Sequence, residues 1–298
     1  MIIVKLKGGF GNQLFQYALA IYIRTVLKTE VKLDTYWFDI NHRRNTPRQL
    51  ELSKIILNFN NEVARENEVK RIKLPSSLMR IKLINEKIDL ITTILNDKFN
   101  NQYYLERQPK KLDDITLIKK TYLDGYWQDS KFSSLCFAEL KSTINFKYVE
   151  ELLHGNPVFK KPNSNDICIH IRRGDYVTSE SANQVHGVCS IDYYEKGKAY
   201  FLSKLERPNF YFFSDDPEWV KENFNHWDNA YFIDNVVSID KDQFEFWYMA
   251  SFNNFIIANS TYSWWAAVFS GSKNVVAPMA WFKQGSNESL LKEGWILM

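Results

Sequence analysis

Residues 167–176 read Ile-Cys-Ile-His-Ile-Arg-Arg-Gly-Asp-Tyr, an apolar run that ends abruptly in two arginines and a glycine. The run predicts a buried strand over 167–171. Side chains alternate along a strand, so the three isoleucines are expected on one face and Cys168, His170 and Arg172 on the other. A buried strand followed directly by charged side chains is typical of the C-terminal edge of a parallel sheet.

The sequence after this strand alternates between helical and strand patterns. Helices are expected at 192–205, 217–224, 243–251 and 262–269, and strands at 210–213, 255–258 and 274–276. Strands that alternate with helices predict a parallel, doubly wound sheet.

The first half of the chain begins in the same way. An apolar run over 2–6, a glycine-rich turn over 7–12, a helical pattern over 13–27 and a second run over 30–34 predict a strand-helix-strand unit. Strands are also expected at 102–107 and 122–127, and a long amphipathic helix at 75–97.

The predicted fold class is therefore α/β, with two Rossmann-like domains. Residues 154–165 are polar and rich in turn-forming residues, which indicates a boundary between domains. We place an N-terminal domain at 1–160, with a helical insert near 75–97, and a C-terminal domain at 161–298.

The composition excludes several classes of protein. The 38 basic and 35 acidic residues give a net charge of +3, which is too small for the basic stripe of a nucleic-acid-binding protein. The sequence contains no run of about 18 apolar residues, which a membrane-spanning helix would need. We also find none of the features of a signal peptide at the start of the sequence. The three cysteines are widely spaced and fit neither a disulfide framework nor a zinc site. We expect a cytoplasmic protein.

The two arginines after strand 167–171 are the first candidate functional residues. Ligands of open parallel sheets bind beyond the C-terminal ends of the strands, where Arg172 and Arg173 stand. A guanidinium can bind two phosphate oxygens at once, which predicts an anion site. The alternative is an ion pair with Asp175 or another carboxylate that holds the loop.

A second polar cluster, Asn259-Ser260-Thr261, opens a predicted helix. Hydroxyl groups and free backbone amides at a helix N-terminus bind phosphate well. The same residues also cap helices, so both roles stay open.

Acidic pairs also precede helices in the second half. Asp215 and Asp216 stand before Pro217, where one carboxylate is expected to cap the helix and the second could accept hydrogen bonds from a base or a ribose. Asp240-Lys241-Asp242 has the D-x-D spacing of some metal sites. It also precedes a predicted helix, and capping is the favoured role.

Several motifs occur together in one known family. They lie at 8–17 (Gly-Gly-Phe-Gly-Asn-Gln-Leu-Phe-Gln-Tyr), 125–128 (Gly-Tyr-Trp-Gln), 170–176 (His-Ile-Arg-Arg-Gly-Asp-Tyr), 186–189 (His-Gly-Val-Cys) with 193–194 (Tyr-Tyr), 213–216 (Phe-Ser-Asp-Asp) and 257–265 (Ile-Ala-Asn-Ser-Thr-Tyr-Ser-Trp-Trp). With these motifs in this order, the chain resembles the bacterial, GDP-fucose-dependent α-1,2-fucosyltransferases over nearly its whole length. The least typical stretch is 70–100.

The resemblance implies a GT-B-type fold, in which the two domains face a cleft, and an enzyme that requires no metal or other cofactor. It implies transfer of L-fucose from GDP-β-L-fucose, with inversion, to the 2-hydroxyl of a terminal galactose on a glycan acceptor. Arg172 would hold the β-phosphate as it leaves. The donor site would be lined by His170, Arg173, Asp215, Asp216, Asn259, Ser260, Thr261 and Ser263, and Asn12 would close over the donor from the first domain.

An inverting reaction also needs a base near the acceptor hydroxyl. Asp175 and His186 are the candidates, although Asp175 could instead pair with an arginine.

The sequence is also compatible with other functions. The same scaffold could transfer another GDP-sugar or use another acceptor hydroxyl. A carbohydrate-binding protein without turnover would need neither paired arginines nor hydroxyls at a helix start. The basic residues within 70–97 could also contact an anionic membrane surface. Such a contact would place the protein on the inner face of the membrane. The favoured alternative is that this segment is a helix packed on the first domain.

Overall fold

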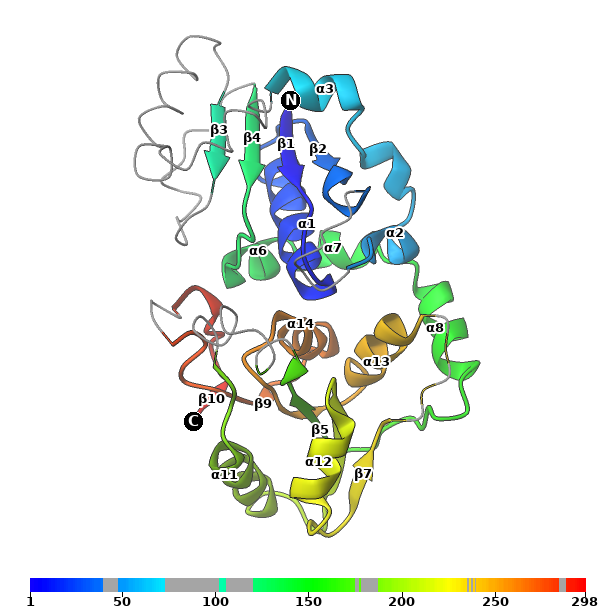
Figure 1. Ribbon diagram of the computed structural model, residues 1–298, viewed down its shortest axis with the longest axis vertical. Coiled ribbons are helices and arrows are strands. Elements are labelled where there is room, and N and C mark those ends of the chain that lie inside the picture. The colour runs from blue at the N-terminus through cyan, green and yellow to red at the C-terminus, as the bar shows by residue number, and fades with distance from the viewer. Residues whose placement is uncertain are drawn as a thin grey trace. The chain divides into compact units, whose positions relative to one another are not determined.

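A computed structural model describes residues 1–39, 48–72, 102–105, 120–174, 177, 187–234, 236, 238, 240–283 and 288–298. These residues form two compact units, Met1–Ile144 and Asn145–Met298 (Figure 1). The sequence predicted a boundary after residue 160, later than the division between Ile144 and Asn145. Helix α8 (Phe146–His154) explains the difference, because it packs against α13 (Lys241–Met249) and so belongs to the second unit. The predicted helix over 75–97 lies outside the described residues.

The first unit contains a parallel sheet. Its described strands are β1 (Ile2–Lys5), β2 (Val31–Asp34), β3 (Gln102–Leu105) and β4 (Thr121–Asp124), in the order β2-β1-β4-β3. Its described helices are α1 (Phe10–Thr25), α2 (Leu52–Ile55), α3 (Glu66–Ile72), α6 (Ser130–Leu135) and α7 (Phe137–Ser142), with 3-10 turns η1 (Tyr36–Asp39) and η2 (Phe59–Glu62). Strand β1 lies between two neighbours, and Ile2, Ile3 and Val4 are fully buried.

Helix α1 follows β1 across the glycine-rich turn and is buried along almost its whole length. It begins at Phe10, three residues before the predicted start, with Gly9 at the N-cap position. It ends at Thr25, whose hydroxyl donates to the carbonyl of Ile21. Lys28 then takes a left-handed conformation (φ 51°), which turns the chain toward β2.

The second unit contains a larger parallel sheet. Its described strands are β5 (Asp166–Ile171), β6 (Asn209–Ser214), β7 (Ala230–Phe232), β8 (Asn254–Ile256), β9 (Asn274–Ala277) and β10 (Ile296–Leu297), in the order β10-β9-β8-β5-β6-β7. Besides α8 and α13, its described helices are α11 (Ile191–Leu202), α12 (Pro217–Phe224) and α14 (Thr261–Ser270), with the 3-10 turn η5 (Glu288–Leu290).

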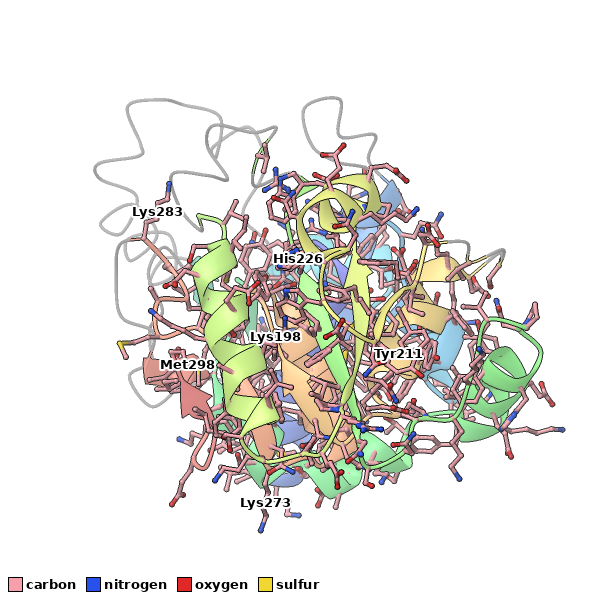
Figure 2. All side chains as sticks on the ribbon, turned by 90° about the horizontal axis from the view of Figure 1, so that it is seen from below. Lys198, Tyr211, His226, Lys273, Lys283 and Met298 are labelled. Atoms are coloured by element: carbon pink, nitrogen blue, oxygen red, sulfur yellow. The ribbon has the colours of Figure 1, made fainter. Side chains whose placement is uncertain are left out.

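Strand β5 is central in this sheet and is buried at all six positions. Its three isoleucines join one core cluster with aromatic side chains of α11 and α12, as the alternation predicted. Met298, labelled in Figure 2, packs against the same cluster. On the opposite face, Phe213 of β6 contacts Tyr248 of α13, with ring centroids 5.3 Å apart. Helices therefore cover both faces of the sheet, which is the doubly wound arrangement.

These two parallel sheets confirm the predicted α/β class. The cleft between the domains stays a prediction. Among the described residues, no helix is long and apolar enough to cross a bilayer.

Candidate functional site

The glycine-rich turn after β1 brings backbone and side chains unusually close together. Gly8 has a left-handed backbone (φ 79°), which favours glycine. A Cβ at this position would lie 3.1 Å from Nδ2 of Asn12 and 3.1 Å from Cε1 of Tyr126. Position 8 therefore requires glycine for two reasons: its backbone is left-handed, and a Cβ there would crowd Asn12 and Tyr126.

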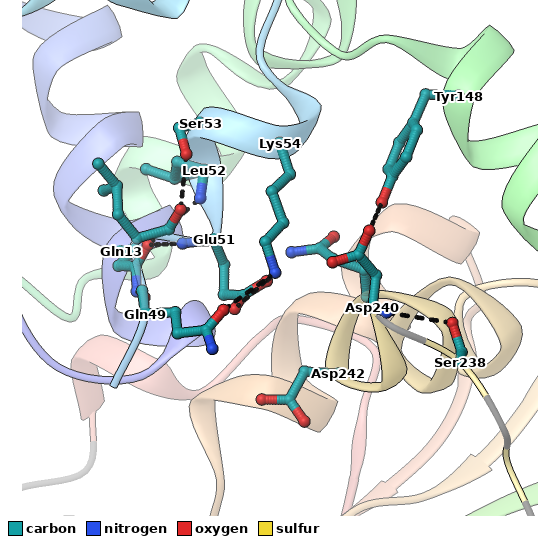
Figure 3. A network of polar contacts seen from close by, with 12 residues as sticks. Gln13, Gln49, Glu51, Leu52, Ser53, Lys54, Tyr148, Ser238, Asp240 and Asp242 are labelled. Atoms are coloured by element: carbon teal, nitrogen blue, oxygen red, sulfur yellow. Dashed lines mark hydrogen bonds and ion pairs between the residues drawn. The ribbon is translucent and has the colours of Figure 1, made fainter. Parts of the chain in front are cut away.

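Two buried glutamines on α1 hold the chain around this turn. The amide nitrogen of Gln13 donates to the carbonyls of Gly8 (3.0 Å) and Gln49 (2.8 Å). Its amide oxygen accepts from the backbone N–H groups of Glu51 (2.9 Å) and Leu52 (3.3 Å), as Figure 3 shows in part. All four hydrogen bonds that a glutamine amide can make are formed.

Gln16 acts in the same way one turn later on α1. Its amide oxygen accepts from the N–H of Lys7 (2.9 Å), and its amide nitrogen donates to the carbonyl of Gly125 (2.9 Å). The turn is thereby fixed to the loop that follows β4. In that loop Gln128 donates to Oδ1 of Asn12 (2.8 Å), which sets the orientation of the Asn12 amide.

Two lysines and one carboxylate lie at the end of the first sheet. Lys5 and Lys7 each place Nζ 2.8 Å from a carboxylate oxygen of Asp124, which is buried. Burial alone would raise the pKa of Asp124, but the two ammonium groups outweigh it and the pKa is lowered. Asp124 therefore stays ionised and leaves one net positive charge beside the glycine-rich turn.

In the second unit, the arginines after β5 pair with the aspartates after β6. Nη1 of Arg172 lies 2.8 Å from Oδ2 of Asp215. Strands β5 and β6 are parallel neighbours, so their ends bring these residues together. Of the two alternatives drawn from the sequence, the structure contains a carboxylate partner for Arg172, and it is Asp215. An anion site at Arg172 stays a prediction.

Arg173 is fixed by three contacts. Its N–H donates to Oδ1 of Asp215 (2.9 Å), and its Nε lies 3.0 Å from Oδ2 of Asp216. The guanidinium carbon lies 3.8 Å from the ring centroid of Trp219 on α12, a cation–π contact. Asp216 also accepts from the N–H of Trp219, which confirms that it caps α12.

Gly174 leaves room for this arrangement. A Cβ at residue 174 would lie 2.4 Å from Oδ2 of Asp215, the atom that contacts Arg172. Any side chain here would displace Asp215 from Arg172.

His170 lies on β5 beside this ion pair, and only 6% of its surface is exposed. Its Nδ1 has no hydrogen-bond partner. Burial and the nearby charge of Arg172 lower the pKa of His170 to about 3, so its imidazole is neutral at physiological pH.

The carboxyl of Glu245 on α13 is also buried. Its Oε1 has no hydrogen bond of good geometry, but it forms an ion pair with Nζ of Lys241 at 3.5 Å. Burial raises the pKa of Glu245 to about 7, and the negative charges of Asp242 and Asp215 add to the shift.

The polar residues around the start of α14 make contacts within the second unit. Ser260 caps the helix by accepting from the N–H of Tyr262, as one of the two alternatives predicted. The Asn259 amide donates to the carbonyls of Gly187 and Trp281, both at 3.3 Å, and so ties two loops to the sheet edge. The hydroxyl of Ser263 donates to the carbonyl of Ser260 (3.3 Å). Thr261 is the first residue of α14.

The D-x-D sequence differs from its prediction. Asp240 occupies the N-cap position of α13, but its side chain does not cap the helix. Instead its carboxylate accepts from the phenol of Tyr148 on α8 at 2.7 Å (Figure 3). The tyrosine competes for the carboxylate, and Asp240 thus joins α8 to α13. Within the described part of the chain, no group of three or more His, Cys, Asp or Glu side chains could hold a metal ion.

The structure therefore brings together His170, Arg172, Arg173, Asp215 and Asp216. Asn12 lies at the turn of the first unit, and Asp175 and His186 lie outside the described residues. Sequence reasoning assigned no role to Gln13, Gln16 or Glu245. The available signal was polar residues within apolar helices, such as the single carboxylate in the run 244–249, Phe-Glu-Phe-Trp-Tyr-Met.

Comparisons with known proteins agree on the class of protein. The profile of the family "Glycosyl transferase family 11" matches residues 1–298. The "O-antigen biosynthesis glycosyltransferase WbnK" of Escherichia coli is 31% identical over 304 residues, which cover 98% of each chain. The "Alpha-1,2-colitosyltransferase" of Escherichia coli is 28% identical over 310 residues, covering 99% of this chain and 98% of the relative.

Among solved structures, the α-1,6-fucosyltransferase NodZ soaked with GDP-fucose matches with a TM-score of 0.48 and 13% identity. The match covers 90% of this chain and 91% of NodZ. Another NodZ structure is described as coming from Bradyrhizobium.

Proposed function

Since the chain belongs to glycosyl transferase family 11, we propose that it transfers L-fucose from GDP-β-L-fucose to the 2-hydroxyl of a terminal galactose, with inversion. The observation that carries this proposal is the group of Arg172, Arg173, Asp215 and Asp216 at the ends of two neighbouring parallel strands. This edge of a doubly wound sheet is where nucleotides bind.

The proposed transfer reaction needs a positive charge beside the leaving diphosphate. Breaking the bond between fucose and phosphate leaves an additional negative charge on the diphosphate. A guanidinium is always ionised and presents a planar fork of donors that matches phosphate oxygens. Arg172 is held by Asp215 before the donor arrives, so little reorganisation is needed during the reaction.

Arg173 is assigned a supporting role. Its contacts with Asp215, Asp216 and Trp219 fix the loop that carries Arg172. In this proposal the hydroxyls of Ser260, Thr261 and Ser263 and the amide of Asn259 complete the donor-binding edge at the start of α14. Asn12 is a further proposed donor-binding residue. Asp175 and His186 remain the proposed candidates for the base that deprotonates the acceptor.

We also propose that the reaction needs no metal. The diphosphate charge would be neutralised by guanidinium groups. Mg²⁺ would need oxygen ligands, and Asp240 already accepts a hydrogen bond from Tyr148.

A second candidate is the transfer of colitose, a sugar that lacks one hydroxyl of L-fucose. It is favoured by the relative named as an α-1,2-colitosyltransferase, which aligns over 99% of this chain. The two donors share GDP, so the residues named above would serve either reaction.

The test is a transfer assay with lactose as the acceptor. GDP-fucose, GDP-colitose and GDP-mannose are supplied in parallel, release of GDP is measured, and the linkage of the product is determined by NMR. Fucose on the 2-hydroxyl of galactose, with GDP-mannose inactive, is the expected result. Faster transfer of colitose would favour the second candidate, and GDP release without a glycosidic product from any of these donors would contradict both.

A further inference from the structure

Two lysines share a single carboxylate at the C-terminal edge of the first sheet. Lys5 is the last residue of β1, Asp124 is the last residue of β4, and these strands are parallel neighbours (Figure 1). Lys7 follows two residues after Lys5, and both ammonium groups lie 2.8 Å from an oxygen of Asp124. Two positive charges and one negative charge therefore meet at the edge where ligands of open parallel sheets bind.

The charge of this group is only partly exposed to solvent. The side chains of Lys5 and Lys7 are 16% and 17% exposed, and that of Asp124 is 5% exposed. Among the described residues, neither lysine forms an ion pair with a second carboxylate. A charge that is removed from water is costly unless an opposite charge compensates it. An anionic ligand would compensate the second ammonium group.

A purely structural role would need only one of the two lysines. Lys32 on the neighbouring strand β2 shows the ordinary arrangement, because it pairs with one carboxylate, that of Glu68, at 2.9 Å. Its side chain is also more exposed, at 24%. Beside Asp124, by contrast, the second lysine adds a charge without adding a partner for it.

An aromatic ring lies next to this charge. Nζ of Lys7 is 4.9 Å from the ring centroid of Tyr126, and 43% of Tyr126 is exposed. The loop that carries the ring is fixed on both sides of it, because Gln16 donates to the carbonyl of Gly125 and Trp127 is buried. Trp127 also has a left-handed backbone (φ 53°), which is rare for a bulky residue and persists only where the surrounding structure imposes it. The exposed ring is thereby held in a defined position.

We propose that Lys5, Lys7 and Tyr126 form an acceptor subsite for a glycan that carries a negatively charged group, a carboxylate or a phosphate. The ring of Tyr126 packs against the apolar C–H face of one sugar, and the two ammonium groups donate to the anion. This inference rests on the proposed function, because it assumes that the first unit binds the acceptor of a sugar transfer.

The donors of this subsite suit an anion better than a neutral sugar. An ammonium group has three N–H donors and no acceptor, and each lysine donates to one oxygen of Asp124. The N–H groups that Asp124 does not use match the oxygens of a carboxylate or a phosphate. A neutral hydroxyl could accept the same hydrogen bonds, but it would not compensate the net charge.

The experiment uses two disaccharides that differ in one group. Lactobionate and lactitol both carry a terminal galactose, and C1 of the open chain is a carboxylate in lactobionate and a CH₂OH group in lactitol. Their binding to the full-length protein with GDP present is measured by NMR titration at low salt. We expect lactobionate to bind about 5- to 30-fold more tightly, the effect of one charge-assisted contact at a partly exposed site. Salt at about 200 mM should reduce this preference, because it screens exposed charges.

Variants assign the preference to particular side chains. Lys7→Gln leaves one ammonium group for one carboxylate, so the preference should fall to about twofold or less. Lys7→Arg keeps the charge and should retain most of the preference. Lys32→Gln is the matched control and should keep the wild-type preference, because it removes an ion-paired lysine from the neighbouring strand. Tyr126→Ala should weaken both disaccharides by about 3- to 10-fold and leave their ratio unchanged.

The diphosphate of the donor could bring the same kind of charge to these lysines. In that case Lys7→Gln would weaken the binding of GDP alone by about tenfold or more, and the preference for lactobionate would be unchanged. This result would overturn the acceptor subsite. We expect the affinity of Lys7→Gln for GDP to stay within about twofold of that of the wild type.

The outcomes separate this inference from the proposed function. Equal affinity of the wild type for lactobionate and lactitol would contradict the anion subsite even if fucose is transferred to lactose, and this result does not depend on any variant folding. An unchanged preference in a folded Lys7→Gln would contradict the role of the lysines. A clear preference for lactobionate without any sugar transfer would support the subsite and contradict the proposed activity. If neither disaccharide bound, both the subsite and a galactose-terminated acceptor would be contradicted.

Discussion

The glycine-rich turn of the first unit and the strand ends of the second unit both bury polar side chains, but they differ in how these are satisfied. Gln13 forms all four of its possible hydrogen bonds, each to the backbone. His170 keeps a buried nitrogen without a hydrogen-bond partner, and Oε1 of Glu245 has only a long ion pair with Lys241 in place of a hydrogen bond. A closed network stabilises a loop whether or not a ligand is present, whereas an open one leaves groups that a ligand can satisfy.

This contrast predicts where substitutions act. Changes in the closed network should reduce stability, and changes at the open one should alter binding and catalysis.

The largest expected effect is at Arg172. Arg172→Ala should lower turnover by about 10²- to 10³-fold, the usual effect of removing one donor to a developing negative charge. Arg172→Lys should restore little, because an ammonium lacks the planar fork. Turnover with GDP-fucose is compared with that of Lys196→Ala, which removes an exposed cation of α11. A folded Arg172→Ala variant with turnover within about threefold of wild type would be incompatible with the phosphate role.

The next effect concerns the closed network. Gln13→Leu leaves four backbone groups without their partner and should lower the free energy of unfolding by about 3 kcal/mol. Urea denaturation measures the change. Ser53→Ala is the control, because its hydroxyl makes one exposed hydrogen bond to Leu50 and should cost less than about 0.5 kcal/mol. If Gln13→Leu lowered the free energy of unfolding by less than about 1 kcal/mol, the hydrogen bonds of Gln13 would not be important for stability.

A smaller, pH-dependent effect is expected at Glu245, which faces Lys241, Asp242 and Asp215. The raised pKa means that the neutral carboxyl stabilises the fold below its ordinary pKa of 4.5, and that this stability is lost as the pH rises to about 7. Glu245→Gln should therefore match the wild type near pH 4 and exceed its stability by about 2–3 kcal/mol at pH 8.

Thermal denaturation across this pH range checks the difference. Glu245→Asp keeps a carboxyl that titrates and should retain the pH dependence. A constant difference between Glu245→Gln and wild type would exclude a buried, titrating carboxyl.

The smallest expected effect is that of removing metal. Turnover of GDP-fucose should persist in excess EDTA, because Arg172 and Arg173 carry the positive charge at the strand ends. Asp240→Asn should leave GDP affinity nearly unchanged, since that carboxylate accepts a hydrogen bond from Tyr148. Loss of turnover in chelator that Mn²⁺ restores would assign the donor site to the D-x-D sequence instead.

The strands and helices that surround the candidate site were predictable because the apolar residues of each recur with one clear period. The isoleucines of β5 alternate and are buried on the predicted face. The polar residues after β5 and β6 were expected at one edge, and parallel pairing of these strands brings Arg172 to Asp215.

The remaining features depend on tertiary contacts that no local pattern contains. Asp240 occupies a cap position, but its carboxylate accepts from Tyr148 on a helix that is distant in the sequence and does not cap. The unit boundary lies before α8 because that helix packs on α13, although the turn signals follow it in the sequence. Gln13 and Glu245 are both polar residues within apolar helices. The neighbouring sequence does not reveal which of the two side chains forms all of its hydrogen bonds.

The order of strands in the first sheet also has a consequence for the nascent chain. Strand β1 pairs with β4, and Lys5 contacts Asp124 across 119 residues. While a ribosome is still synthesising the segment before β4, one edge of β1 is exposed with its backbone groups unpaired. We expect this apolar strand to be a binding site for chaperones during translation, until residues 121–124 emerge and cover it.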